Sequence, residues 1–396
     1  MSKPVILAAR RTPVGRFFGG LSTVASPQLG AYAIAAALDA VPGARDRVDE
    51  CIMGCVLQAG LGQNPARQAG LKAGLPDTLS AQTINKVCGS GLQAVMLASQ
   101  AIRAGDASVV VAGGMENMTA APHYATLRFG AKFGPVEFRD HMQYDGLTCA
   151  FEGWGMTNAA DHIARAHDVP RTEQDRFSAQ SHQRAAAATA AGWFAAEIVP
   201  LTGEQVGNRK APGPEGGVVA DEGIRADTTA ETLAKLRTVP GHDTITAGNA
   251  SQISDGGAAI VVASEAAASE LGAPPLARII GSHTSGVAPK EIFHAPAIGI
   301  AALLERHNLT VADIDLFELN EAFAAQALAN IKVLGIPESK LNVAGGGIAI
   351  GHPIGASGAR VLTTLVHQLI RVGGTRGIVS LCLGGGNSVS MLIERP

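Results

Sequence analysis

Residues 85–92 read Asn-Lys-Val-Cys-Gly-Ser-Gly-Leu, and this stretch places a cysteine where a predicted strand breaks on two glycines into a predicted helix. After the break, Leu92, Val95 and Ile102 recur at helical spacing. Cys88 is therefore expected at or just before a helix N-terminus, where unpaired amides and the positive dipole end lower the pKa of a thiol and favour the nucleophilic thiolate. The alternative is a buried apolar thiol in a glycine-rich turn.

The overall composition indicates a tightly packed protein without an electrostatic preference for nucleic acid. A length of 396 residues suggests two or three domains. The formal net charge of −3, with no run of lysine or arginine, excludes the basic surface that nucleic-acid binding requires. With 48 glycines and only 16% charged residues, the chain is expected to bury much of its surface, either in its own core or by association with further copies.

The cysteines and the N-terminal sequence indicate the cellular compartment in which the protein is expected. Five cysteines, at positions 51, 55, 88, 149 and 382, form an odd and scattered set that indicates a reducing compartment rather than a disulfide framework. Cys51 and Cys55 lie in an apolar run without a second pair of ligands, so no metal site is predicted there. The apolar run Val5–Ala9 is too short for a signal peptide, and no window reaches the ~18 apolar residues of a membrane span. We therefore expect a soluble, cytoplasmic protein with no membrane partner.

Strand-like and alanine-rich helical runs alternate over residues 1–118, which is typical of an α/β fold with helices covering a parallel or mixed sheet. The amino-acid composition changes over residues 119–246. This segment contains ten of the sixteen aromatic residues and the Gly/Pro/charge-rich run Gly203–Thr228. We interpret this segment as an inserted loop domain. Residues 247–271 are expected to complete the first half. Its earlier strands are expected at Val5–Ala9, Glu50–Val56, Ser80–Val87 and Ser108–Gly113.

The second half, residues 272–396, repeats the pattern of the first. In each half a glycine-rich turn, at Cys88–Gly91 and at Gly351–Gly355, precedes an amphipathic helix, and a later strand ends in a glycine cluster. The repetition predicts duplicated domains packed about a pseudo-two-fold axis, with both turns facing one crevice. In the rest of the chain a helix is expected from Glu321, and strands are expected at Ala258–Ser264, Leu276–Ser282, Ile314–Leu319, Asn342–Gly351 and Gly377–Leu383.

Four polar stations follow predicted strands: Cys88-Gly89-Ser90, Asn320-Glu321-Ala322-Phe323, Gly351-His352-Pro353 and Cys382-Leu383-Gly384. Strand ends of an α/β sheet converge on a crevice, so two thiols, an imidazole and an amide can share one pocket. That set suits acyl transfer: one thiolate attacks a carbonyl, His352 is the base, the second thiol moves a proton, and Asn320 with backbone amides donates to an oxyanion. Each residue also has a structural alternative, with Asn320 as a helix N-cap, His352 as a turn histidine and Cys382 as a core thiol.

These stations are similar to the four catalytic loops of the thiolases, the coenzyme A-dependent acyltransferases. The chain resembles that family from Ala9-Arg10-Arg11-Thr12-Pro13 through Ala247-Gly248-Asn249-Ala250-Ser251 to Ser380-Leu381-Cys382-Leu383-Gly384-Gly385-Gly386. The resemblance implies two βαβαβαββ halves in a five-layer αβαβα arrangement with an inserted loop domain, assembled as a dimer or a dimer of dimers. It also implies coenzyme A as substrate and product, with no further cofactor and no metal.

By the same resemblance, Cys88 is the acylated nucleophile, His352 activates it, and Cys382 removes or returns the α-proton of the second acyl group. Asn320, through a bound water, and His352 would form one oxyanion hole, and the amides of Cys88 and Gly384 would form the other. The remaining implied roles are contacts to coenzyme A from Arg225 and Ser251, and a pantetheine and acyl channel lined by Leu147, Met156, Ala322 and Phe323.

The implied activity is that of an acetyl-CoA C-acetyltransferase, which condenses two acetyl-CoA molecules to acetoacetyl-CoA and catalyses the reverse thiolysis. The alternative is a broader 3-ketoacyl-CoA thiolase of fatty-acid β-oxidation. Two departures from the family pattern concern the channel: Gly155 stands where acetoacetyl-type members commonly have a histidine, and Thr238–His242 is slightly short and lacks an aromatic residue. A scaffold or lipid-binding relative without turnover would lack one of the two thiols or His352, and Cys382 disfavours a condensing enzyme that works on carrier proteins.

Overall fold

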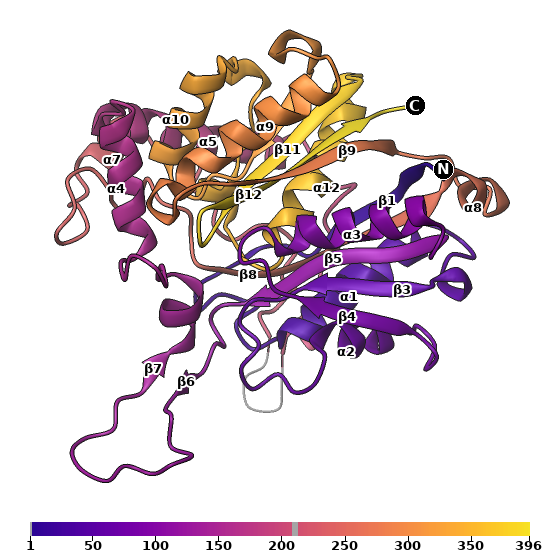
Figure 1. Ribbon diagram of the computed structural model, residues 1–396, viewed down its shortest axis with the longest axis horizontal. Helices are drawn as coiled ribbons and strands as arrows, with labels where there is room; N and C mark the ends of the chain where they lie inside the picture. Colours follow the sequence, from indigo (N-terminus) through magenta and orange to yellow (C-terminus); the bar gives the residue numbers. More distant parts are fainter. Residues whose placement is uncertain (1, 208–212) are drawn as a thin grey trace.

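A continuous sheet carries the fold, and its strand order is similar on either side of the junction between β1 and β9 (Figure 1). The computed structural model describes residues 2–207 and 213–396. Strand order is β10-β11-β12-β9-β1-β8-β5-β3-β4, and β1 meets β9 through only two antiparallel pairs, Val5 with Arg278 and Ile6 with Ala277. The strands on the first side of this junction are β1 (Pro4–Arg11), β8 (Ser254–Ser264), β5 (Val109–Asn117), β3 (Glu50–Gly54) and β4 (Ser80–Ile84), with β2 (Gly15–Arg16) paired to β8. Those on the other side are β9 (Ala277–Gly286), β12 (Asn387–Glu394), β11 (Arg376–Leu383) and β10 (Leu316–Leu319).

Helices cover both outer faces and fill the space between the halves of the sheet, which gives five layers. On the first half, α1 (Ser26–Asp39) and α2 (Pro65–Lys72) form the outer layer. On the second, α9 (Ala295–Arg306) packs on β9, β11 and β12, with α10 (Ala324–Leu334) beside it. The central layer is the pair α3 (Ser90–Ala104) and α12 (Ser357–Val372), which contact each other and strands of both halves.

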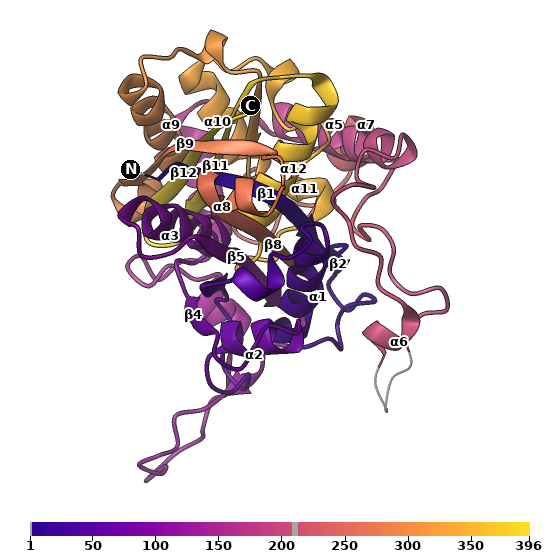
Figure 2. The same ribbon diagram turned by 90° about the vertical axis from the view of Figure 1, so that its right-hand side faces the viewer.

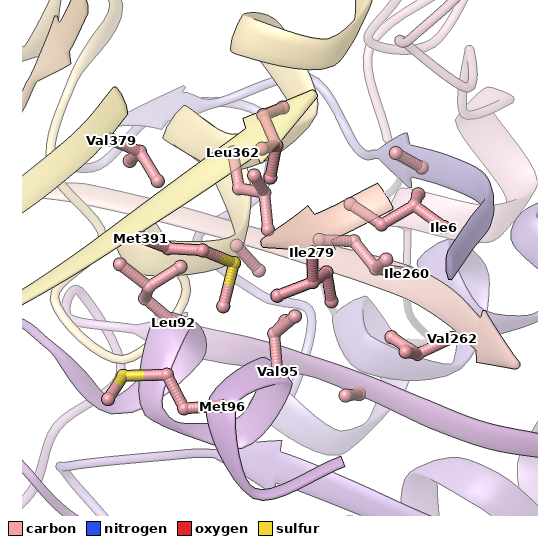
Figure 3. Close-up of a cluster of buried hydrophobic side chains, with 14 of the residues drawn as sticks. Ile6, Leu92, Val95, Met96, Ile260, Val262, Ile279, Leu362, Val379 and Met391 are labelled. Atoms are coloured by element: carbon pink, nitrogen blue, oxygen red, sulfur yellow. The ribbon is translucent and has the colours of Figure 1, made fainter. Parts of the chain in front are cut away.

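The central core lies around α3 and α12 (Figure 3). Leu92, Val95 and Met96 of α3 face Leu362 of α12 and Met391 of β12 in a single buried cluster. Separate clusters lie under the outer helices of each half. The N-cap residue of α3 is Gly89, so no capping side chain accepts a hydrogen bond there. Packing of the helix against both halves therefore holds its N-terminal end in position.

Each expected strand overlaps an observed one except Asn342–Gly351, where the prediction is wrong. Only a single parallel bridge, Leu341 with Phe317, remains of a strand there, and the short helix α11 (Gly347–Ile350) follows. Asn342 and Gly345 have left-handed φ values of 42° and 81°, which an extended strand does not accommodate. The second half is therefore βαβα-αββ, with its third strand reduced to one bridge.

The helix expected from Glu321 begins at Ala324, and its N-cap is Phe323. The alternative that Asn320 serves only as an N-cap is therefore wrong, since Asn320 lies outside the helix and its side chain is free for another purpose.

Residues 119–246 run mainly over the second half. They contain α4 (Met156–Ala166) and α5 (Arg171–Ala190), which pack on α10, the shorter α6 (Gly203–Val206) and α7 (Ala230–Ala234), and the π-helical turn Met142–Gly146. Of the run Gly203–Thr228, residues 208–212 lie outside the described part of the chain. The small pair β6 (His123–Tyr124) and β7 (Arg139–Asp140) closes a long hairpin that extends away from the body in both views (Figures 1 and 2). The division into three domains stays a prediction.

Helices long and apolar enough to cross a membrane are absent from residues 2–207 and 213–396.

The two halves touch backbone to backbone where β5 passes the loop before α12. A Cβ atom on Gly114 of β5 would overlap the carbonyl oxygen of Gly355 and lie 2.9 Å from Cα of Ala356. Glycine at position 114 is thus required for close approach of the halves.

We expect Gly114→Ala to lower the free energy of unfolding by about 1–3 kcal/mol, because backbone atoms on both sides must move. Gly256→Ala on the adjacent strand β8 is the matched control, since its Cβ would meet its nearest neighbours at 3.5 Å, an ordinary contact. Guanidinium unfolding of both variants provides the measurement. Equal stability of the two variants would contradict the close-approach argument.

Candidate active site

The four predicted stations meet at one pocket with a volume of about 550 Å³. Cys88, His352, Cys382 and Gly384 all line it. Of the predicted binding residues, the ones that share this lining are Ser251, Leu147, Met156, Ala322 and Phe323. Sequence patterns did not identify several further lining residues, among them Val87, Met118, Gln143, Gln252, Phe293 and Ile354.

Two predicted residues lie outside the lining. Asn320 is fully buried behind His352, with its Nδ2 3.4 Å from Nε2 and 3.5 Å from Nδ1 of the imidazole. Its Oδ1 has no hydrogen-bond partner among the described residues, and an unsatisfied buried amide oxygen costs about 1–3 kcal/mol. A water or a substrate group at this oxygen would remove that cost. Arg225 is exposed on the surface, and its amide donates to Nδ1 of His182 at 3.2 Å.

A strained turn presents Cys88 to the pocket. Val87, a β-branched residue, has φ 46°, a conformation that such residues rarely adopt. Ser90 holds the turn, because its Oγ donates to the carbonyl of Val87 at 2.6 Å and accepts from the amide of Lys86 at 2.8 Å. Cys88 itself is half-buried and precedes Gly89, the residue before α3. The predicted placement at a helix N-terminus is confirmed.

The predicted direction of the Cys88 pKa is wrong. Burial raises the pKa of the Cys88 thiol to about 12, and hydrogen bonds from the amides of Cys88 and Gly384 offset only part of that rise. The low polarity of the pocket therefore outweighs the helix terminus. The thiol is protonated at neutral pH, and a base must accept its proton during attack.

His352 lines the same pocket as Cys88, and its imidazole is neutral, as a base must be. Burial, with a smaller contribution from the positive charge of Arg360, lowers the pKa of His352 to about 3, so the imidazole is neutral at pH 7. Nδ1 lies 2.6 Å from Oγ of Ser357, and that hydroxyl donates its only proton to the carbonyl of Pro353 at 2.9 Å. With the hydroxyl proton assigned to that carbonyl, Nδ1 is the protonated nitrogen, which leaves the lone pair of Nε2 available. Ser357 carries no motif signal of its own; its place at the start of α12 is visible only in the structure.

Cys382 lies near the end of β11 and is 1% exposed. Burial raises the pKa of its thiol well above the ordinary value, and a negative charge on Cys88 raises it further. The two sulfurs thus influence each other electrostatically, and both are uncharged in the resting pocket. Two uncharged thiols and a neutral imidazole can pass protons without leaving an isolated charge.

The residues that the structure describes contain no group of three or more His, Cys, Asp or Glu side chains arranged to hold a metal ion. Cys51 and Cys55 are both buried, and Cys55 points its thiol at the carboxylate of Glu116, 3.6 Å away.

Comparisons with known proteins agree with this geometry. Residues 4–266 match the family described as the thiolase N-terminal domain, and residues 273–395 match the thiolase C-terminal domain. The chain belongs to the thiolase family. It is 49% identical over 393 residues, 99% of each chain, to a protein of Chromobacterium violaceum named acetyl-CoA acetyltransferase. A protein of Escherichia coli with the same name is 48% identical and covered in full. The crystal structure of the Bacillus anthracis acetyl-CoA acetyltransferase superposes with a TM-score of 0.96 at 40% identity, covering 100% of this thiolase and 99% of that chain. The thiolase fold, with its layered α/β arrangement, is thereby confirmed.

We expect His352→Ala to slow alkylation of Cys88 by iodoacetamide at pH 7 by ~10²–10⁴-fold, the usual contribution of a general base. The raised pKa of Cys88 fixes the sign of the pH dependence: without the base, the rate should climb with pH toward about 12, so that variant and parent converge in alkali. Stopped-flow alkylation with peptide mapping measures this. A His352→Ala variant as reactive as its parent at pH 7 would show that another group accepts the proton.

Proposed function

We propose that this thiolase is an acetyl-CoA acetyltransferase that condenses two acetyl-CoA molecules to acetoacetyl-CoA and catalyses the reverse thiolysis. The observation that carries the proposal is the single pocket that holds two thiols, Cys88 and Cys382, together with His352. Relatives of about half identity over the full length bear the same activity in their names, which supports it.

In the first half-reaction Nε2 of His352 takes the proton of Cys88 as its sulfur attacks the acetyl carbonyl. The amides of Cys88 and Gly384 are the donors for the oxyanion. The C–S bond to coenzyme A then breaks, and Cys382 gives its proton to the departing thiolate. Acetyl-Cys88, a protonated imidazole and a Cys382 thiolate remain, so the pocket carries one charge of each sign.

In the second half-reaction the Cys382 thiolate removes a proton from the methyl group of a second acetyl-CoA. The enolate oxygen lies toward protonated His352 and the water held by Asn320, and the carbanion attacks acetyl-Cys88. A carbon–carbon bond forms, the bond to Cys88 breaks, and His352 returns its proton to the released thiolate. Both thiols and the neutral imidazole are restored.

Coenzyme A binding follows from the same assignment. Ser251 and the apolar residues Leu147, Met156, Ala322 and Phe323 contact the pantetheine arm and the acyl group, while exposed Arg225 meets the charged end outside the pocket. We propose that coenzyme A is the only cofactor-like molecule required and that no metal takes part. Five unpaired thiols favour a reducing compartment such as the cytoplasm, where the products would enter fatty-acid metabolism.

Replacement of Cys382 by alanine should abolish carbon–carbon bond formation while Cys88 remains open to acetylation by acetyl-CoA, because only the second half-reaction requires the α-proton to move. Mass spectrometry of the peptide containing Cys88 and exchange of the acetyl-CoA methyl protons in D₂O measure the two steps. Cys88→Ala, which has no acceptor for the acetyl group, is the control. Normal methyl exchange in Cys382→Ala, or label on Cys382 in the parent, would reverse the assignment of the two thiols.

Gly155 affects the length of the acyl chain that the pocket can accept. It lines the pocket, and a Cβ there would lie 3.6 Å from Oγ1 of Thr157, so a side chain fits without a clash. Trp154, which could otherwise occupy the space, packs near His162 with ring centroids 6.2 Å apart and does not line the pocket.

We expect 3-ketoacyl-CoA substrates of four to six carbons to differ by less than roughly tenfold in kcat/KM, since one methylene or one neutral hydrogen bond is worth only ~1 kcal/mol. Gly155→His should narrow the range toward the four-carbon substrate, and Gly155→Ala should change it little. Thiolysis rates across the series decide the matter. Rejection of the six-carbon substrate by several orders of magnitude would mark an enzyme restricted to acetoacetyl-CoA.

We propose a homo-oligomer, a dimer or a dimer of dimers. Strand β4 is one of the two edges of the sheet and is partly exposed along its length, which leaves backbone groups free to pair with another copy. The long hairpin carries exposed apolar side chains, and Phe129 and Phe133 are 90% and 101% exposed. A monomer would leave this cluster in water.

Light scattering should give a mass at least twice that of the 40.4 kDa chain. Phe129→Ser with Phe133→Ser should reduce the assembly where the hairpin makes contacts, because those contacts are apolar. Val219→Ser, at an exposed apolar residue on another surface, is the control. A stable monomer at working concentration would contradict the proposal.

A further inference from the structure

A buried carboxylate joins the two halves beside the active site. Glu116, at the end of β5, is fully buried. Its Oε2 accepts from the amides of Val56 at 3.0 Å and Gly355 at 2.9 Å, and its Oε1 accepts from the amide of Leu57 at 3.1 Å.

These three amides belong to different parts of the site. Val56 and Leu57 follow β3 of the first half, whereas Gly355 lies in the second half, between His352 and the start of α12. Ile354, the neighbour of Gly355, lines the pocket and packs with Val56 and Leu57, and Cys88 lies against the same cluster. One side chain therefore determines how the histidine loop sits relative to the nucleophile.

The remainder of the histidine loop is anchored at its other end. The amide of His352 donates to the carbonyl of Gln252 and to Oγ of Ser254, both at 3.2 Å. The glycine at 355 makes the second anchor possible, because a Cβ atom there would lie 2.6 Å from Oε2 of Glu116 and 3.0 Å from Cα of Cys55.

We propose that Glu116 is a positioning residue for catalysis, which fixes the loop of His352 so that Nε2 faces the thiol of Cys88. Burial raises the pKa of Glu116 to about 7, and the three amides oppose that rise by favouring the ionised form. A carboxylate suits this position because its neighbours are donors and, once ionised, it only accepts. A glutamine side chain in place of Glu116 would turn its NH₂ group toward at least one backbone N–H, and the hydrogen bond from that N–H would be lost. The inference rests on the proposed function, in which His352 is the base.

The test compares Glu116→Gln with a control of the same kind. Asp255 on β8 is also fully buried, and its carboxylate binds the amide and hydroxyl of Thr119 at 3.0 and 2.7 Å, whereas the histidine loop is anchored by the neighbouring Ser254. Both variants lose a buried carboxylate. Glu116→Gln should lower kcat at least tenfold with KM changed less than threefold, and should slow iodoacetamide alkylation of Cys88 at pH 7 to a similar degree. Asp255→Asn should retain kcat and the alkylation rate even where its melting temperature falls.

A double variant separates positioning from general damage. If Glu116 acts through His352, adding Glu116→Gln to His352→Ala should slow alkylation less than twofold further. Full additivity, or a folded Glu116→Gln with kcat and alkylation within twofold of the parent, would overturn the proposal. Where Glu116→Gln does not fold, Glu116→Asp keeps the charge but withdraws it by one methylene, and the same two outcomes apply to it. Alkylation requires no acetyl-CoA, so a parent enzyme that lacks acetyl transfer would count against the proposed function and leave this test intact.

Discussion

The packing of α3 against α12 is the constraint on which the active site depends. The two helices are in contact near their N-terminal ends, where a Cβ atom on Gly91 would lie 2.7 Å from the amide nitrogen of Ala359. Only glycine allows backbones to approach this closely. Cys88 precedes one helix by two residues and His352 precedes the other by five, so the contact that closes the core also brings nucleophile and base together. The positive end of α3 then lies beside Cys88, where a thiolate forms.

Burial of that junction determines the charge state of the site. The same low polarity raises the pKa values of both thiols and lowers the pKa of the imidazole, so every group rests uncharged. In the proposed mechanism charge separates only in the presence of substrate, when the amides of Cys88 and Gly384 are available to stabilise it. A site of permanent ions would instead attract water and lose the advantage of a dry pocket.

Local sequence could predict the strands, the turn before α3 and the convergence of four stations, because each depends on periodicity or on glycine. Other features depend on contacts that no local pattern reveals. The bond from Glu116 to Gly355 spans 239 positions, and the pKa of Cys88 follows from burial by residues of both halves. The strand expected at Asn342–Gly351 fails because the side chain of Asn342 binds both the amide and the carbonyl of Leu319 and holds the chain in a turn. An apolar, glycine-rich run does not distinguish that turn from a strand.

The duplicated architecture accounts for the positions of the polar residues at the strand ends. Strands β5 and β11 occupy corresponding places on either side of the sheet's centre, as do β3 and β10. In the second half the ends of β10 and β11 carry Asn320, which lies behind His352, and Cys382, which lines the pocket. In the first half the equivalent ends carry Cys55–Leu57 and Glu116, which face the histidine loop of the second half. One set of strand ends thus holds the reacting groups while the other holds the loop that activates them. This division explains why Glu116, at the end of β5, is fully buried although it does not line the pocket. Glu116 binds the loop of the other half of the protein, and the pocket forms only when the two halves meet at the right distance.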